Sequence, residues 1–272
     1  LRVIHGSRDY EKMNTEFPTR QAYLDCFCCP PNLVRTIAQA SGWAYSLSDN
    51  GVAVNLYGGN LLDTELLDGT KIKLTQETQY PWDGEVKITI DESKEAPFDM
   101  LLRIPDWAEG SSLTINGKDA GVSVVPGEFA TINRAWKKGD VVQLTLPMEV
   151  NFVEGNDRIE EVRNQVAIQR GPVVYCVESA DLPEEVGILD VYIKGDPSKL
   201  RADYKPDFLG GVTTLTGEVL LRKEDDNKGS MYNKMQKPDW KSYKTTFVPY
   251  FAWSNRNGGK EGEMTVFLPV VW

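Results

Sequence analysis

The chain has no excess of basic residues, no long apolar run and a single histidine, His5. Its 272 residues carry 30 Lys and Arg against 40 Asp and Glu, which gives a formal net charge of −10. Because phosphate binding relies on clustered Lys and Arg, this composition argues against nucleic acid and other polyanions as partners. The apolar runs are far shorter than the roughly 18 residues of a membrane helix, so we expect no membrane span.

The composition is typical of a folded, soluble protein. Hydrophobic residues make up 41% of the chain and charged residues 26%, which excludes disorder for most of it and predicts one to three domains. The chain begins at Leu1 without an initiator Met, a charged leader or an apolar signal segment. We therefore expect a fragment of a longer protein.

Three of the four cysteines, Cys26, Cys28 and Cys29, fall within four consecutive positions. A disulfide framework would space its cysteines to connect distant segments, and a bond between adjacent cysteines is far from ordinary disulfide geometry. Clustered thiols instead indicate a metal site or a reactive thiolate. Cys176 stands apart, inside an apolar segment, and we expect it in the core.

A helix follows the cysteine cluster. Leu33, Ile37 and Ala40 recur at helical spacing over 33–42, and Gly42 is a natural stop. Prolines are tolerated in a first turn, so Pro30 and Pro31 are compatible with a helix that starts near Cys29. Its positive N-terminal end would favour anionic sulfur at Cys28 and Cys29.

Beyond residue 45 the pattern changes to short strands separated by turn residues. Strands at intervals of about 8 to 12 residues without intervening helices predict β-sandwiches, with a boundary near residue 150. The segment 223–244 is rich in Lys, Asp, Asn and Gly and is interpreted as a solvated loop. The expected strands include 51–57, 86–90, 113–115, 142–146, 166–169, 173–177, 247–253 and 264–268.

Other residues have both a structural and a functional interpretation. Cys26 is a packed thiol or supports the site, in preference to being a zinc ligand itself, and His5 is a lone histidine more than twenty positions from the cluster. Glu16 and Asp25 are solvated carboxylates or line a sugar pocket. Four tryptophans fit sandwich cores better than sugar stacking, although both roles suit an aromatic ring; they are Trp82, Trp107, Trp136 and Trp253.

Several ordered motifs resemble glycoside hydrolase family 127, formerly a domain of unknown function, or a close sister family. Its best-known members are β-L-arabinofuranosidases. The first motif is the segment from Cys28 to Asn32, Cys-Cys-Pro-Pro-Asn, with a helix behind it. The others, in the expected order, are Tyr80-Pro81-Trp82-Asp83-Gly84, Arg103-Ile104-Pro105-Asp106-Trp107, Gln169-Arg170-Gly171-Pro172-Val173-Val174-Tyr175-Cys176 and Pro249-Tyr250-Phe251-Ala252-Trp253-Ser254-Asn255-Arg256.

The resemblance implies a mainly β fold: two consecutive β-sandwich domains preceded by the last loop and helix of an (α/α)6 catalytic barrel. The implied domains are 1–45 for the end of the barrel, 46–150 for the first sandwich and 151–272 for the second. It also implies that Cys28 is both the catalytic nucleophile and a zinc ligand and that Cys29 is a second zinc ligand. The remaining ligands, a Glu and a Cys, and the Glu acid/base would lie upstream of this chain.

We therefore expect the C-terminal part of a retaining glycosidase that uses zinc and a cysteine nucleophile. Its partner would be a carbohydrate, an arabinose-containing plant glycan from which it releases β-L-arabinofuranose or a related sugar. The fragment alone would be inactive. The alternatives are a non-catalytic, carbohydrate-binding pair of sandwiches and a scaffold that supports the barrel or forms a homodimer. The exact sugar and the compartment, bacterial cytoplasm or periplasm, stay open.

Overall fold

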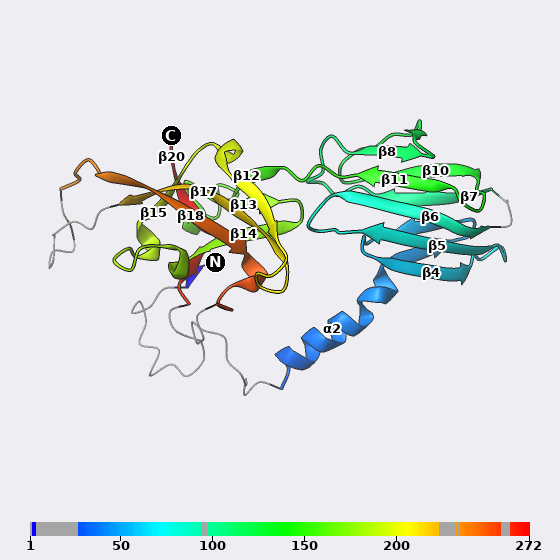
Figure 1. Cartoon of the computed structure of the whole chain (residues 1–272), viewed down its shortest axis with the longest axis horizontal. Helices are drawn as coiled ribbons and strands as arrows, with labels where there is room; N and C mark the ends of the chain where they lie inside the picture. The colour runs from blue at the N-terminus through cyan, green and yellow to red at the C-terminus, as the bar shows by residue number, and fades with distance from the viewer. Residues whose placement is uncertain (1, 4–26, 94–96, 223–231, 233, 257–261) are drawn as a thin grey trace. The chain divides into compact units, whose positions relative to one another are not determined.

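The computed structural model describes residues 2–3, 27–93, 97–222, 232, 234–256 and 262–272, and strands dominate it (Figure 1). The chain divides into two compact units, one spanning Asp25–Glu149 and the other combining Val150–Trp272 with the start of the chain. The prediction of a mainly β protein is confirmed. In the described part of the chain, no helix is long and apolar enough to cross a membrane.

Helix α2 (Cys29–Trp43) confirms the predicted helix, including its start near Cys29, and extends it beyond the predicted stop at Gly42. It begins four residues before Leu33, because Pro30 occupies the first turn, where its missing N–H costs no helical hydrogen bond. It continues through Gly42 to Trp43, and Ala44 closes it by donating its backbone N–H to Ser41 O at 3.3 Å. Gly42 is therefore a helical residue and not the stop.

The unit Asp25–Glu149 contains two sheets. The four-stranded sheet has the order β10-β7-β3-β2, and the six-stranded sheet has the order β4-β5-β6-β11-β8-β9. The first comprises β2 (Tyr45–Ser48), β3 (Gly51–Val54), β7 (Pro97–Arg103) and β10 (Phe129–Ala135). The second comprises β4 (Asn60–Glu65), β5 (Lys71–Thr78), β6 (Glu85–Ser93), β8 (Ser112–Ile115), β9 (Lys118–Asp119) and β11 (Val141–Thr145).

The core of this unit follows the alternation predicted from the sequence. Val86, Ile88 and Ile90 in β6 are completely buried, whereas the side chains between them point to the other face of the sheet. Trp136 is also completely buried and donates its indole N–H to Phe98 O at 3.0 Å, so its polar atom is satisfied inside the core. The sheets therefore bury a continuous apolar core.

The Asn116–Gly117 hairpin is confirmed between β8 and β9, where Ile115 pairs with Lys118. Both turn residues have positive φ, 50° at Asn116 and 76° at Gly117, which is the backbone of a type I′ turn. Asn and Gly adopt this conformation at the lowest cost. The Asn116 side chain also accepts a hydrogen bond from Val141 N at 2.9 Å, which ties the hairpin to β11.

The other unit is built from strands that form one hydrogen-bonded network. β13 pairs with β20 over its first half and with β14 over its second half, so the sheet folds over and closes on itself. The strands are β1 (Arg2–Val3), β12 (Val150–Glu154), β13 (Gln165–Arg170), β14 (Val173–Glu178), β15 (Val191–Lys194), β16 (Arg201–Lys205), β17 (Val212–Arg222), β18 (Trp240–Pro249), β19 (Met264–Thr265) and β20 (Phe267–Val271). Short 3-10 turns lie between them at η1 (Glu160–Val162), η2 (Ser179–Asp181), η3 (Ile188–Asp190), η4 (Pro197–Lys199) and η5 (Tyr250–Ala252).

Three predictions for this unit were wrong in part. The predicted strand 264–268 is divided at Val266 into β19 and β20. The predicted strand 247–253 ends at Pro249, and its aromatic continuation forms η5. The predicted loop 223–244 is too long, because 240–244 belong to β18 and pair with β17 from Lys244↔Glu218 to Trp240↔Arg222. The polar side chains on the outward face of β18 resemble those of a loop, although the backbone of this segment pairs continuously with β17.

An ion network connects Arg256, four residues beyond η5, to the end of β14 and to η2. The Arg256 guanidinium donates to Glu178 Oε2 at 3.1 Å and to Asp181 Oδ1 at 2.8 Å, and it lies 5.6 Å from the centre of the Phe208 ring. Burial alone would lower the pKa of Arg256, but the hydrogen bonds and charges of Asp181 and Glu178 outweigh it and raise that pKa. Glu178 also accepts from Ser254 N at 2.7 Å, so this buried carboxylate is fully engaged.

Candidate functional site

The candidate site is the pair Cys28 and Cys29 at the N-terminus of α2. Cys28 is the N-cap residue and Cys29 is the first helical residue. Helix formation starts here because Asn32 N donates to Cys28 O at 3.1 Å, while Pro30 stiffens the first turn. The sequence prediction that both thiols lie at a helix N-terminus is confirmed.

The two sulfur atoms are close together and accessible. Cys28 Sγ and Cys29 Sγ are 3.6 Å apart, and both residues are exposed. In a tetrahedral zinc site with Zn–S bonds of about 2.3 Å, two sulfur ligands lie about 3.8 Å apart. The observed separation therefore fits two ligands of one zinc ion.

The positive end of the α2 dipole lies at these sulfurs. Backbone N–H groups of the first turn have no intrahelical acceptor and point toward the N-cap, where they form the positive end of the helix dipole. No acidic side chain occupies the first turn, and no side chain caps it. Since the thiolate is the form that binds metal and attacks carbon, the position suits both roles.

The apolar side of α2 is also exposed. Leu33, Val34 and Ile37 are 62%, 66% and 66% exposed, and no residue of the helix is buried. A helix with an apolar stripe normally buries it against another element. Within the described residues, α2 thus presents both its thiols and its apolar side to the outside.

The structure does not complete a metal site. Among the described residues, no group of three or more His, Cys, Asp or Glu side chains is arranged to hold a metal ion. The other candidate residues of the N-terminal segment lie outside the described residues; they are His5, Glu16, Asp25 and Cys26. Cys176 is 1% exposed in β14 of the other unit, where burial raises the pKa of its thiol, so its prediction as a core residue is confirmed.

The tryptophans follow their structural interpretation. Trp136 is completely buried, and Trp107 packs against the same core. Trp253 packs against a second apolar cluster and donates its indole N–H to Gly262 O at 2.8 Å. Trp82 is half-buried in the turn after β5.

Two family models match the chain in succession. Residues 51–148 match the middle domain of the family 127 β-L-arabinofuranosidases, and residues 150–269 match the C-terminal domain of glycoside hydrolase family 127. The chain belongs to glycoside hydrolase family 127. The two matches correspond to the strand-rich parts of the two compact units.

Relatives of this family 127 chain are longer than it is. A non-reducing end β-L-arabinofuranosidase of Bifidobacterium longum subsp. longum is 32% identical over 255 residues, which cover 91% of this chain and 38% of the relative. A crystal structure of a family 127 β-L-arabinofuranosidase from Geobacillus stearothermophilus T6 has a TM-score of 0.89 at 34% identity, and it covers all of this chain and 42% of its own. A structure described as a glycoside hydrolase also has a TM-score of 0.89, at 37% identity, with 44% of its own chain covered.

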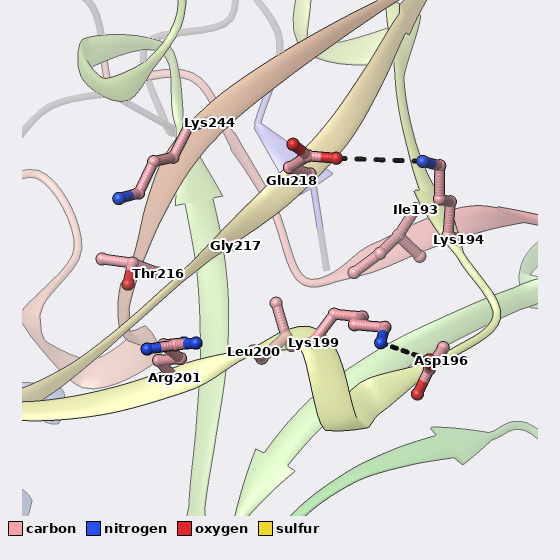
Figure 2. Close-up of a pocket in the computed structure, with 10 residues that line it drawn as sticks. All are labelled: Ile193, Lys194, Asp196, Lys199, Leu200, Arg201, Thr216, Gly217, Glu218 and Lys244. Atoms are coloured by element: carbon pink, nitrogen blue, oxygen red, sulfur yellow. Dashed lines mark ion pairs between the residues drawn. The ribbon is translucent and has the colours of Figure 1, made fainter.

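The family 127 chain also carries a groove that the sequence did not predict. It lies over the middle of β17, and its charged side chains come from the consecutive strands β15 to β18 and from the turn at η4 (Figure 2). Arg201 comes from β16, Thr216 from β17 and Lys244 from β18. No motif joins these positions. A weak signal is the lysine-rich segment that ends at Lys244, whose composition indicates a loop.

Proposed function

We propose that this chain is the C-terminal part of a retaining glycosidase that releases β-L-arabinofuranose or a related sugar from plant glycans, with Cys28 as its nucleophile. The observation that carries the proposal is the pair of exposed thiols, 3.6 Å apart at the start of α2, in a chain of family 127. The chain spans about two-fifths of the length of the relatives it matches. The activity belongs to the whole protein.

Zinc is the metal that this pair suits. Cys28 and Cys29 would supply two thiolate ligands, and the other two, a Glu and a Cys, would come from a preceding (α/α)6 barrel. Zinc held there would keep the two thiols deprotonated at neutral pH. The exposed apolar side of α2, with Leu33 and Ile37, supports this arrangement because a preceding domain would cover it.

In a retaining mechanism, Cys28 would act from the face of the sugar opposite the departing oxygen. Its thiolate attacks the anomeric carbon while a Glu of the barrel gives a proton to the departing glycosidic oxygen, so the C–O bond breaks as a C–S bond forms. In the second step the same Glu takes a proton from water, the water oxygen attacks the anomeric carbon, and the C–S bond breaks. Sulfur replaces the carboxylate nucleophile of most retaining glycosidases.

Substitution in the full-length protein tests the proposal. Cys28→Ser is expected to lower kcat for a 4-nitrophenyl β-L-arabinofuranoside at least a thousandfold, because a serine hydroxyl is not ionised at neutral pH. Cys29→Ser is expected to lower both zinc content and activity. Cys176→Ser, a thiol in the core of the other unit, is the control and leaves the zinc stoichiometry unchanged. A Cys28→Ser enzyme with full activity and full zinc would disprove the proposal.

The alternative is a pair of β domains that bind carbohydrate or support the barrel without taking part in catalysis. Under that alternative, neither thiol substitution changes kcat by more than a fewfold. A homodimer through these domains also stays a prediction, and gel filtration of the chain with light scattering measures it.

A further inference from the structure

A groove of about 520 Å³ lies where β17 changes its neighbour from β16 to β15. Arg201 pairs with Thr216, and Glu218 pairs with Lys244, so these four side chains share the outward face of the sheet. Gly217, between them, allows Leu200 to pack against the strand: an added Cβ would come within 2.2 Å of Leu200 Cδ2. The volume is in the range of small-molecule sites, roughly 300 to 1,000 Å³.

The groove is cationic in an acidic chain. It is lined by four basic side chains and two acidic ones, and the acids are each matched: Lys194 Nζ lies 3.8 Å from Glu218, and Lys199 Nζ lies 3.9 Å from Asp196. Figure 2 shows these two pairs on one side and Lys244, Thr216 and Arg201 in a row on the other. The groove therefore has two more basic than acidic side chains.

The row contains the unmatched positive charge. Arg201 and Lys244 are exposed, and within the described ranges neither side chain has an ion pair or a hydrogen bond. A guanidinium group presents two parallel N–H donors that match a carboxylate, and a lysine ammonium adds a point charge. Thr216 lies between them in the row and offers a hydroxyl donor.

Two aromatic rings lie farther along the same face. Tyr192 pairs with Leu220, and Trp240 pairs with Arg222, so both point outward like Lys194 and Lys244. Their ring centroids are 4.7 Å apart, and the rings are half-buried. Exposed parts of such rings pack against the apolar faces of sugars, while the neighbouring charges select for polar substituents.

We propose that this groove binds a carboxylate-bearing oligosaccharide, whose uronate group contacts Arg201, Thr216 and Lys244 and whose next sugars extend toward Tyr192 and Trp240. The inference goes beyond the proposed glycosidase activity, because it uses none of the residues at the start of α2. It gives the C-terminal unit a role in holding an acidic glycan.

The net charge of −10 disfavours long polyanions such as nucleic acids, but it does not exclude a short acidic oligosaccharide. Screening limits surface charges to about 8 Å at physiological ionic strength, so a ligand in the groove experiences mainly the local basic side chains. A short oligosaccharide also brings few charges in total, since a tetramer with one carboxylate per sugar has only four. An acidic peptide also spaces its carboxylates, but the aromatic pair and the membership in a glycoside hydrolase family favour a glycan.

Calorimetric titration of the 272-residue chain with a tetramer of galacturonic acid tests the proposal. We expect saturable binding that weakens with added NaCl and is lost when the same tetramer is methyl-esterified, because esterification removes the charge and keeps the sugar. Arg201→Gln and Lys244→Gln are each expected to weaken binding about tenfold, the effect of one charged hydrogen bond. Lys241→Gln is the matched control: Lys241 is exposed on β18 but does not line the groove.

Equal binding of the esterified tetramer, equal binding by Arg201→Gln, or no binding of the acid tetramer would each overturn the proposal. Tetraglutamate that binds as tightly as the tetramer would overturn the assignment to a glycan. Thermal unfolding of each variant shows that it is folded. Because the readout is binding and needs neither zinc nor hydrolysis, its failure leaves the proposed function of Cys28 untouched, and an inactive Cys28→Ser enzyme leaves this proposal untouched.

Discussion

Helix α2 exposes its apolar side chains and the strands that follow it bury theirs, although both belong to the unit Asp25–Glu149. In β6, Ile88 is completely buried between the sheets; in α2, Ile37 is 66% exposed. The same contrast holds for tryptophan, completely buried at position 136 and 51% exposed at position 43. The strands bury their apolar side chains against one another, whereas the helix has an apolar side that no described residue covers.

The difference teaches where stability and function are located in this chain. A β unit that buries its own core folds on its own contacts. The helix, by contrast, carries the two thiols and exposes the surface against which a catalytic domain would pack. The proposed chemistry therefore depends on a helix that buries none of its residues, and substitutions in matched pairs measure how much that helix contributes to stability.

The largest expected effect is that of Trp136→Ala. It removes a completely buried ring and the hydrogen bond to Phe98 O, so we expect the free energy of unfolding to fall by about 3–5 kcal/mol. Trp43→Ala is the matched control on α2 and is expected to change it by no more than about 0.5 kcal/mol. Urea unfolding followed by tryptophan fluorescence and circular dichroism measures both. Similar losses for the two variants would abolish the distinction between helix and strands.

Arg256→Met, in the other unit, is expected to have the next largest effect and to lower the free energy of unfolding by about 3 kcal/mol. It leaves the buried Glu178 and the half-buried Asp181 without their positive partner, which costs more than the ion pair itself contributes. Arg256→Lys keeps the charge but loses the two-pronged guanidinium contact, so we expect a loss between those of the wild type and Arg256→Met. Thermal unfolding of the three proteins gives the order, and a Lys variant as unstable as the Met variant would contradict it.

The sequence predicted the parts of the fold in which pattern and burial agree. Alternation in 86–90 predicted β6 because one face of that strand is buried and the other is not. It missed the start of β18, where Ser242 and Lys244 face outward and only the pairing with β17 defines a strand. The polar residues there indicate a loop, but pairing with β17, more than twenty residues earlier for Ser242 and Lys244, makes the segment a strand.

The candidate site was predictable to a similar extent. The spacing of Cys28 and Cys29 before an amphipathic segment predicted two thiols at a helix N-terminus, since capping and periodicity are local properties. The groove was not predictable. Arg201, Thr216 and Lys244 come together only because β16 and β18 pair with opposite edges of β17. The packed sheet sets these strand registers, and no fixed spacing of residues in the sequence indicates them.

A smaller, pH-dependent effect on the free energy of unfolding is expected at Asp140, which lies in the turn before β11. Burial raises the pKa of this carboxyl, but hydrogen bonds from Asn116 Nδ2 at 2.8 Å and Lys137 N at 3.0 Å, with Arg134 nearby, outweigh it and lower the pKa below its ordinary 3.8. Because the folded-state pKa is depressed, the stabilisation is present above about pH 4 and is lost as the pH falls below 3.8.

Asp140→Asn is therefore expected to lower the free energy of unfolding by about 1 kcal/mol at pH 7 and by less at pH 3. Urea unfolding at the two pH values measures the difference. Asp49→Asn, at an exposed turn residue, is the control and is expected to leave stability unchanged at both. A loss at Asp140 that is as large at pH 3 as at pH 7 would contradict the assignment of this stabilisation to the ionised carboxylate.

The smallest expected effect returns to α2. Ile37→Ala removes an exposed side chain and introduces a better helix former, so we expect the stability of this chain to change by no more than about 0.5 kcal/mol. Ile88→Ala, the buried counterpart, is expected to cost about 2–5 kcal/mol. If a preceding domain covers α2, the cost of Ile37→Ala approaches that of Ile88→Ala in the full-length protein while it stays near zero in this chain. A cost near zero in both proteins would mean that the apolar side of α2 has no partner there either, and the arrangement proposed for the two thiols would lose its structural support.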